Sequence, residues 1–256
     1  ASASDARLEA LGGLWDPWGG ATPEGESAPA PVSAAPTDVH AFISWLARTA
    51  TRDLEIAADP TRADTEEART LSASALGRYA SAVTLANAYG INLDAGEEEA
   101  AAINDRVNTA SRQGTQTWAI DLFDEPAISS TFAPSGKDLA SSEELSEAVA
   151  MWDCTASTLP KAQVAAGTLT DAYDVSGQLL TRAQVALRAG ATDTRTPRCE
   201  LPATDAATLA SNLLAVDAAM ISSDSASVRT AGASAALADI EQWAPRTSLP
   251  ALIAVR

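Results

Sequence analysis

The only histidine in this 256-residue sequence is His40, and its chemistry can be tested against its sequence neighbours. An imidazole can serve as the base for a serine nucleophile, but such a base needs positioned partners. The nucleophile-elbow sequence G-x-S-x-G is absent, and so are the glycine-rich sequences that cradle phosphates. His40 follows Val39 in the first turn of a predicted helix, where it packs against neighbours or faces water. A hydrolase that uses His40 is therefore kept as an alternative and no catalytic residue is assigned.

Three groups of acidic residues could offer oxygen ligands to a metal, at positions 97–99, 121–125 and 171–174. Calcium takes such ligands, but the spacing of an EF-hand loop with its central glycine is missing. The glutamates at 97–99 are explained by the start of a helix, whose dipole favours negative charge. Asp121 and Asp124 form the best of the three groups, and a calcium site there stays open. No Glu-x-x-His pair occurs, which excludes a conventional di-iron carboxylate centre.

Two cysteines, Cys154 and Cys199, lie 45 positions apart with no CxxC and no neighbouring histidine. Pairing with each other is the simplest interpretation; two buried thiols that behave as small apolar residues are the alternative. A disulfide closing a loop of this size stabilises a fold by about 4 kcal/mol and indicates an oxidising compartment. The pairing sets a condition on the fold. Either residues 191–199 run back along the bundle, or the helix predicted over 161–190 breaks, at Gly167 or Gly177.

The charge balance is strongly acidic, with 17 Lys and Arg against 34 Asp and Glu and a net charge of −17. Such a chain has no basic stripe to release counterions from phosphates, which argues against a nucleic-acid partner. Apolar residues make up 46% of the sequence, enough to argue against disorder of the whole chain. No run of about 18 apolar residues is present, so we expect no transmembrane helix.

Apolar residues recur at helical spacing along most of the chain, while the alternation typical of strands never persists. We therefore predict an all-α protein, an antiparallel helical bundle of about seven helices, for which a ferritin-like shape without a metal centre stays open. Residues 37–256 form the bundle domain, with helical hairpins over 37–114 and 141–245. The predicted helices lie at about 37–58, 61–90, 94–114, 141–160, 161–190, 204–221 and 223–243.

Residues 1–36 are predicted to form a short helix, over 5–15, followed by a strap rich in Pro, Ala, Ser and Gly. This strap cannot bury enough apolar surface to order itself. Trp15 and Trp18 flank Asp16-Pro17 just before the strap, and two indole rings in one turn can anchor a partner. They are the candidate partner contacts. The alternative is that both rings dock the N-terminal segment onto the bundle.

The chain begins with Ala1-Ser2-Ala3-Ser4, is rich in Ala and Arg, and has lysine only at Lys137 and Lys161. In this composition it resembles exported proteins and envelope lipoproteins of actinobacteria. That resemblance implies an extracytoplasmic accessory or assembly protein, secreted or tethered to the membrane by a lipid anchor or by its partner.

From the resemblance and the missing catalytic patterns we expect a non-catalytic exported binding or scaffold protein of the cell envelope. Its partner would be a protein of a membrane-associated complex, and we assign no cofactor and no metal. The first alternative is a carrier that holds a small or apolar ligand between helices. The second is the hydrolase or calcium-dependent protein that uses His40 or the Asp121/Asp124 cluster.

Overall fold

The computed structural model describes residues 2–10, 13, 35–91, 93, 132–166, 171–199 and 205–254. Within these ranges the chain is all-helical and contains no strand, as the sequence predicts. The elements are listed here in chain order: α1 Ser2–Ala10, α2 Val39–Ala58, α3 Thr65–Tyr89, the 3₁₀ turn η1 Leu139–Ser141, α5 Glu143–Ala166, α6 Ala172–Ala189, α7 Ala206–Ile221 and α8 Ala226–Trp243.

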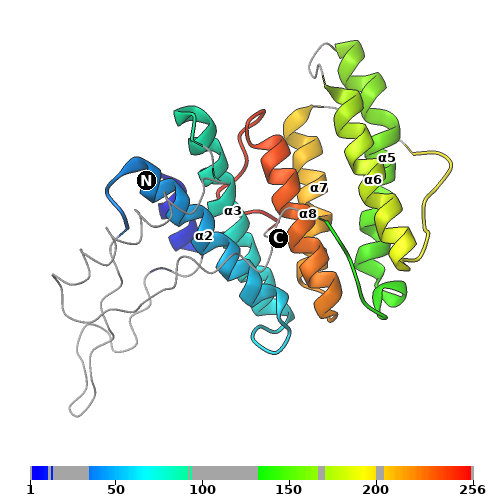
Figure 1. The fold of residues 1–256 in the computed structure, drawn as a ribbon, viewed down its shortest axis with the longest axis horizontal. Helices are drawn as coiled ribbons and strands as arrows, with labels where there is room; N and C mark the ends of the chain where they lie inside the picture. The colour runs from blue at the N-terminus through cyan, green and yellow to red at the C-terminus, as the bar shows by residue number, and fades with distance from the viewer. Residues whose placement is uncertain are drawn as a thin grey trace.

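Six of these helices form three antiparallel hairpins that stand side by side (Figure 1). The α2/α3 hairpin lies at one end, the α5/α6 hairpin at the other, and the last hairpin in sequence, α7/α8, lies between them. Contacts of α3 and α2 with α8, and of α5 with α7, join the row. The middle hairpin therefore belongs to two four-helix units at once.

Each four-helix unit has its own apolar core, and α7 and α8 contribute to both. In α7, Leu214 and Ile221 face the first core while Leu213 and Met220 face the second. Because neighbouring positions point into different cores, α7 is apolar nearly all round, as expected of a helix buried between two others. The largest side chains of the second core are Trp152 and Trp243, both fully buried.

The helix ends follow from local capping. The Asp38 carboxylate accepts the N–H of Ala41 at the start of α2. Asp64 accepts the N–H groups of Glu66 and Glu67, while the Glu67 side chain accepts the Asp64 N–H, a complete capping box for α3. Gly90 ends α3 with a left-handed conformation (φ 65°), which glycine adopts without steric cost.

The predicted helix over 161–190 is wrong, and so is the predicted end at Pro160. Helix α5 continues through Pro160 to Ala166, and α6 begins at Ala172. A proline inside a helix leaves the carbonyl four residues earlier without its usual donor. That carbonyl belongs to Ala156, and it accepts the hydroxyl of Ser176 from α6. The neighbouring helix thus satisfies the group that Pro160 leaves open.

Residues 191–199 run back along α5, which is the condition that the disulfide imposes. Thr192 donates to the Ala140 carbonyl (2.7 Å) and Thr194 to the Ser146 carbonyl (2.9 Å). The return ends at Cys199, which is joined to Cys154 with a Cα–Cα distance of 5.5 Å. The predicted disulfide is confirmed.

One buried arginine joins the first two hairpins of the row. Arg229 of α8 is almost fully buried and donates to three main-chain carbonyls, those of Ser223, Ala57 and Ala63. The Ala57 carbonyl lies in the last turn of α2, where a cation also complements the helix dipole. Arg229 therefore holds the turn between α2 and α3 against the start of α8.

The C-terminal residues return to the first hairpin and lie on α3. The N–H of Ile253 donates to the Ala73 carbonyl (3.2 Å), and the Ile253 side chain joins the first core. The main chain at Ala251 passes directly over Gly77, which has no side chain to obstruct it. We call residues 251–254 the C-terminal tail.

Candidate functional site

An open groove of about 1020 Å³ runs along the outer side of the α2/α3 hairpin. Three parts of the chain line it. The first is α1, through Ser4, Arg7 and Leu8. The second is α2 with the chain just before it, through Ala35, Phe42, Trp45, Leu46, Asp53 and Ile56. The third is the stretch from Arg62 to Arg78, which includes the first half of α3. We call it the α1–α3 groove.

The floor of the α1–α3 groove is apolar because α2 repeats apolar side chains on this face. Phe42, Trp45 and Ile56 are half-buried, so each is covered by protein on one side and open to the groove on the other. The rings of Phe42 and Trp45 stack with centroids 5.9 Å apart. Leu71 of α3 completes the floor. Trp45 thus lines the groove and is not fully buried.

An ion pair crosses the floor between Asp53 of α2 and Arg78 of α3. Both side chains are partly exposed, so the pair contributes little to stability. It does hold the Asp53 carboxylate and the Arg78 guanidinium together between α2 and α3. The Nε of Arg78 is buried and has no hydrogen-bond acceptor among the described residues.

Helix α1 is fixed at one end of the groove by Arg7. Its Nε donates to the Ala251 carbonyl (2.9 Å), and its Nη2 donates to the Gly77 carbonyl and the Ser81 hydroxyl (both 2.7 Å). Burial, and secondly the nearby Arg78, lower the pKa of Arg7 from its usual value. One side chain thus joins α1, α3 and the C-terminal tail. Leu8, on the same helix, remains 39% exposed at the groove.

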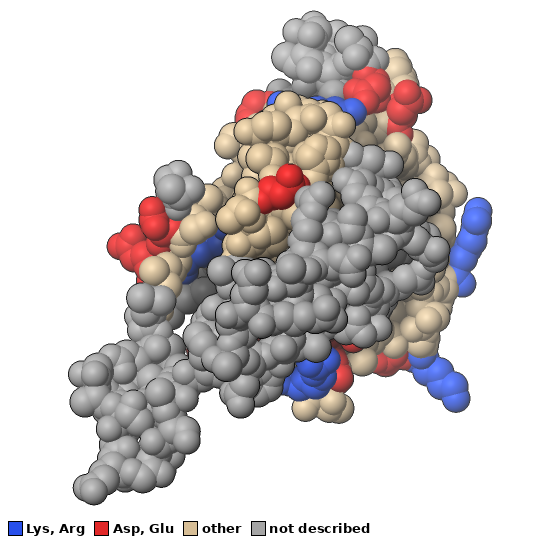
Figure 2. Space-filling view, turned by 60° about the vertical axis from the view of Figure 1, so that its left-hand side comes forward, with Lys and Arg blue, Asp and Glu red and all other residues tan. Residues whose placement is uncertain are grey.

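The opposite end of the groove, where α3 begins, carries the charged residues Arg62, Asp64, Glu66 and Glu67, all exposed. Asp64 and Glu67 are engaged in the capping box described above. Figure 2, in which the side of the molecule with the α2/α3 hairpin comes forward, shows an uncharged stretch of surface among acidic and basic side chains. The groove therefore pairs an apolar, aromatic floor with a charged, mainly acidic margin.

These features suit binding more directly than chemistry. His40 lies in the first turn of α2 and is exposed; it does not line the groove. In the part of the chain that the structure describes, no three His, Cys, Asp or Glu residues gather as a metal site. Asp171 pairs with Arg246, on the chain after α8, so the 171–174 group includes an ion pair between segments. The remaining predicted site residues, Trp15, Trp18, Asp121 and Asp124, lie outside the described residues, as do the predicted helix over 94–114 and most of the strap.

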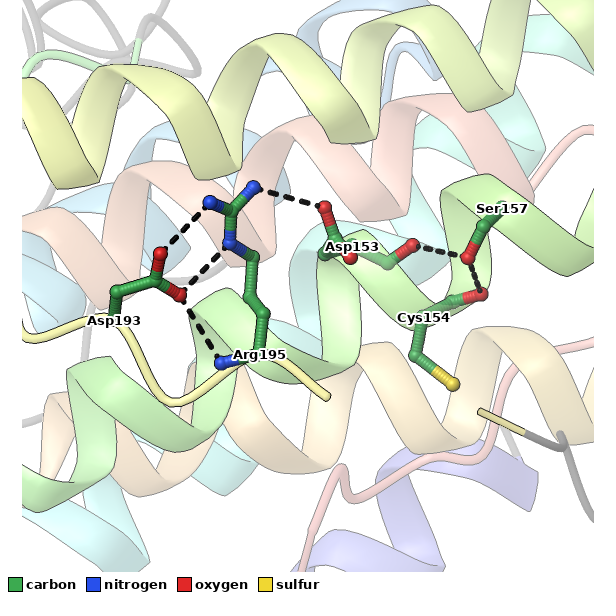
Figure 3. Close-up of polar contacts among 5 residues, drawn as sticks. All are labelled: Asp153, Cys154, Ser157, Asp193 and Arg195. Atoms are coloured by element: carbon green, nitrogen blue, oxygen red, sulfur yellow. Dashed lines mark hydrogen bonds and ion pairs between the residues drawn. The ribbon is translucent and has the colours of Figure 1, made fainter. Parts of the chain in front are cut away.

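Polar side chains lie beside Cys154 (Figure 3), and two of them, Asp193 and Arg195, are exposed. Arg195 lies between two carboxylates, donating to Asp193 through Nε and Nη2 (2.9 and 2.8 Å) and to Asp153 through Nη1 (3.2 Å). Hydrogen bonds from Arg195 are the main cause that lowers the pKa of Asp193 to about 2. Asp153 directly precedes Cys154, so this ion-pair cluster and the disulfide hold the same turn of α5 to the returning segment.

Two features escaped the sequence analysis. The first is the groove, because Phe42 and Leu46 belong to one apolar stripe and spacing alone does not separate core from floor. The second is an acidic pair in the second core, Asp217 and Asp239. A signal for Asp217 was present: it interrupts the apolar run Leu213-Leu214-Ala215-Val216 and Ala218-Ala219-Met220.

None of the helices in the described part of the chain is both long enough and apolar enough to cross a membrane. The chain matches no protein-family model, no curated protein and no solved structure.

Proposed function

We propose that the protein is a non-catalytic binding protein of the cell envelope, whose α1–α3 groove accepts an apolar helical segment of a partner protein. The observation that carries this proposal is the open, aromatic-floored groove. Its lining residues on α2, from Phe42 to Ile56, cover about 21 Å at 1.5 Å per residue. That length suits about four turns of a bound helix, the helix-in-groove mode of recognition.

The presence of α1 beside the groove supports a helix as its occupant. Helix α1 lies at one end of the groove, and Ser4, Arg7 and Leu8 border it, spaced as one face of a helix. One helix of the chain, α1, therefore already borders the groove through one of its faces. Leu8 leaves an apolar edge beside which a second helix can pack.

The partner's charge and compartment follow from two further observations. A net charge of −17 favours approach of a partner with basic flanks, because electrostatic steering raises association rates. The Cys154–Cys199 disulfide indicates an oxidising, extracytoplasmic compartment. A secreted or lipid-anchored accessory subunit of a membrane-associated complex fits both.

The second candidate is a carrier of a small or apolar ligand, and the size of the groove favours it. Pockets for small molecules measure roughly 300–1000 Å³, and the groove lies at the upper end of this range. Its openness and length favour the helix. Here the ligand would lie on the outer face of a hairpin and not inside a core.

The test uses a synthetic peptide of about four helical turns with leucines along one face and lysines along the other. The matched control is a peptide of the same composition whose scrambled order has no apolar stripe. We expect the striped peptide to bind and its NMR shift changes to map to the groove. Equal binding of both peptides, or no binding of either, contradicts the proposal.

Two variants locate the binding. Leu8→Glu places a charge at the groove, whereas Leu180→Glu places one on α6, and these leucines are 39% and 38% exposed. We expect Leu8→Glu to weaken peptide binding at least about tenfold, equivalent to roughly 1.4 kcal/mol, and Leu180→Glu to leave it unchanged. An equal effect of both variants contradicts binding in the groove. A small apolar probe that displaces the peptide favours the carrier.

A further inference from the structure

Four side chains, one from each helix of the second four-helix unit, meet in its core. They are Trp152 of α5, Arg182 of α6, Asp217 of α7 and Asp239 of α8. Asp217 is 0% exposed and Asp239 2% exposed, and the other two are also buried. Charged residues at such positions are rare in proteins unless they are paired.

The contacts among these four side chains leave the two aspartates side by side with no donor between them. Arg182 donates from Nη2 to Asp239 Oδ1 (2.7 Å), and its guanidinium lies 5.3 Å from the ring centre of Trp152. Trp152 donates from Nε1 to Asp217 Oδ1 (3.3 Å). Asp239 is also close enough to Asp217 to be one of the groups that raise the pKa of its carboxyl group. Two ionised carboxylates cannot hydrogen-bond to each other, because neither has a proton to donate.

The balance of charges and the carboxylate oxygens that lack a hydrogen-bond donor both indicate a bound proton. Two aspartates face one arginine, so ionisation of both would leave a negative charge in the core without a partner, which is strongly unfavourable. Asp217 Oδ2 and Asp239 Oδ2 are also buried, and neither has a hydrogen-bond partner among the described residues. A single proton between these carboxyl groups supplies the missing donor and removes the excess charge.

We propose that the folded protein holds one proton between Asp217 and Asp239, carried by Asp217, and that this proton closes the junction between the α5/α6 and α7/α8 hairpins. Asp239 remains ionised because it bonds directly to Arg182. The proton acts as a structural ligand: each of the four helices reaches it directly or through one neighbour. The core is then a pH-sensitive element of a protein whose proposed groove lies on a different hairpin.

The electrostatics around Asp217 agree with this assignment. Burial is the main cause that raises the pKa of Asp217 well above its usual value, followed by the charge of Asp239; Arg182 and the Trp152 N–H oppose the rise. In the unfolded chain Asp217 ionises near the ordinary aspartate pKa of about 3.9. The stabilising contribution of the proton is therefore complete below that pH and is lost as pH rises through the folded pKa of Asp217. Across this window the unfolding equilibrium constant rises by up to about tenfold per pH unit.

The first test is an NMR titration of the aspartate carboxyl carbons in the wild-type protein. We expect the Asp217 signal to remain that of a protonated acid after the surface aspartates have ionised, while Asp239 has the shift of a carboxylate. Ionisation of Asp217 together with the surface aspartates overturns the proposal, and so does a protonated Asp239 beside an ionised Asp217.

Two isosteric variants then separate a proton from mere packing. Asp217→Asn is neutral and can still donate to Asp239, so we expect it to fold and to lose the wild-type decline in stability with rising pH. Asp239→Asn leaves Asp217 as the only acid facing Arg182, so we expect the Asp217 titration to shift to lower pH. A wild-type slope in Asp217→Asn, or an unmoved titration in Asp239→Asn, refutes the shared proton. If either variant fails to fold, the wild-type titration decides.

Discussion

Replacing Gly77 by alanine tests whether the C-terminal tail and α1 are one unit on α3. A Cβ built at Gly77 would lie 1.8 Å from the Ala251 carbonyl oxygen, 2.6 Å from its carbon and 3.3 Å from the Leu252 nitrogen. These are main-chain atoms, which cannot move aside as the tip of a side chain can. The methyl group must therefore displace the C-terminal tail from α3.

The expected loss of stability follows from what the C-terminal tail contributes. Ile253 is 2% exposed, and exposing such a side chain costs about 1.5–3 kcal/mol. Arg7 loses the Ala251 carbonyl, and an unsatisfied buried donor costs about 1–3 kcal/mol. Alanine returns about 1 kcal/mol through its higher helix propensity. The net loss in the free energy of unfolding is roughly 1.5–5 kcal/mol.

Gly177 provides the matched control, since it lies inside α6 and a Cβ there meets nothing within 4 Å. Gly177→Ala should stabilise the protein by about 0.5–1 kcal/mol. The same substitution therefore changes the free energy of unfolding in opposite directions at the two sites. Urea unfolding measures both variants. If Gly77→Ala is as stable as the wild type or more stable, the C-terminal tail does not bind α3 as described and Arg7 does not link it to α1.

Three further predictions concern other parts of the fold. Arg229→Met leaves three main-chain carbonyls without their donor and should lower the free energy of unfolding by at least about 3 kcal/mol; a loss below about 1 kcal/mol in urea unfolding would show that these bonds are not formed. The double variant Cys154→Ala/Cys199→Ala should lose about 4 kcal/mol, and thiol titration of the denatured wild type should find free thiols only after reduction; thiols that react before reduction would contradict the disulfide. Arg195→Ala should raise the pKa of Asp193 from about 2 toward about 3.9, as followed by NMR. Because the pKa of Asp193 is lowered in the fold, the ionised carboxylate stabilises the protein above the pKa that Asp193 has in the unfolded chain, and this contribution is lost as pH falls toward 2. The variant should therefore lose this pH dependence of stability. An unmoved pKa would show that Arg195 does not hold Asp193.

The helical class and the disulfide could be predicted from the sequence, the first because apolar residues recur at helical spacing and the second because the chain has only two cysteines. Asp59-Pro60 marks the end of α2, Gly90 marks the end of α3, and the apolar spacing between them gives the buried faces. The pairing of Cys154 with Cys199 requires either that residues 191–199 run back or that the 161–190 helix breaks; the structure shows the returning segment and also separate helices α5 and α6.

The failures arose where a contact distant in sequence overrides a local signal. Pro160 is an ordinary helix stop, but Ser176 of the next helix satisfies the carbonyl that it frees, and α5 continues. The groove depends on which part of an apolar stripe another helix covers, which the α2 sequence does not contain. The acidic pair requires knowing that Asp217 and Asp239 face each other across the α7/α8 hairpin.

The most direct test of the proposed function is site-specific photo-crosslinking in the native cell envelope. A photo-reactive residue takes the place of Leu8 in one version of the protein and of Leu180 in another, two positions of nearly equal exposure on different hairpins. We expect a covalent adduct with one protein partner from position 8 and none from position 180, and an excess of the striped peptide should suppress it. Equal adducts from both positions, no adduct from position 8, or an adduct that the peptide leaves unchanged would contradict partner binding in the α1–α3 groove.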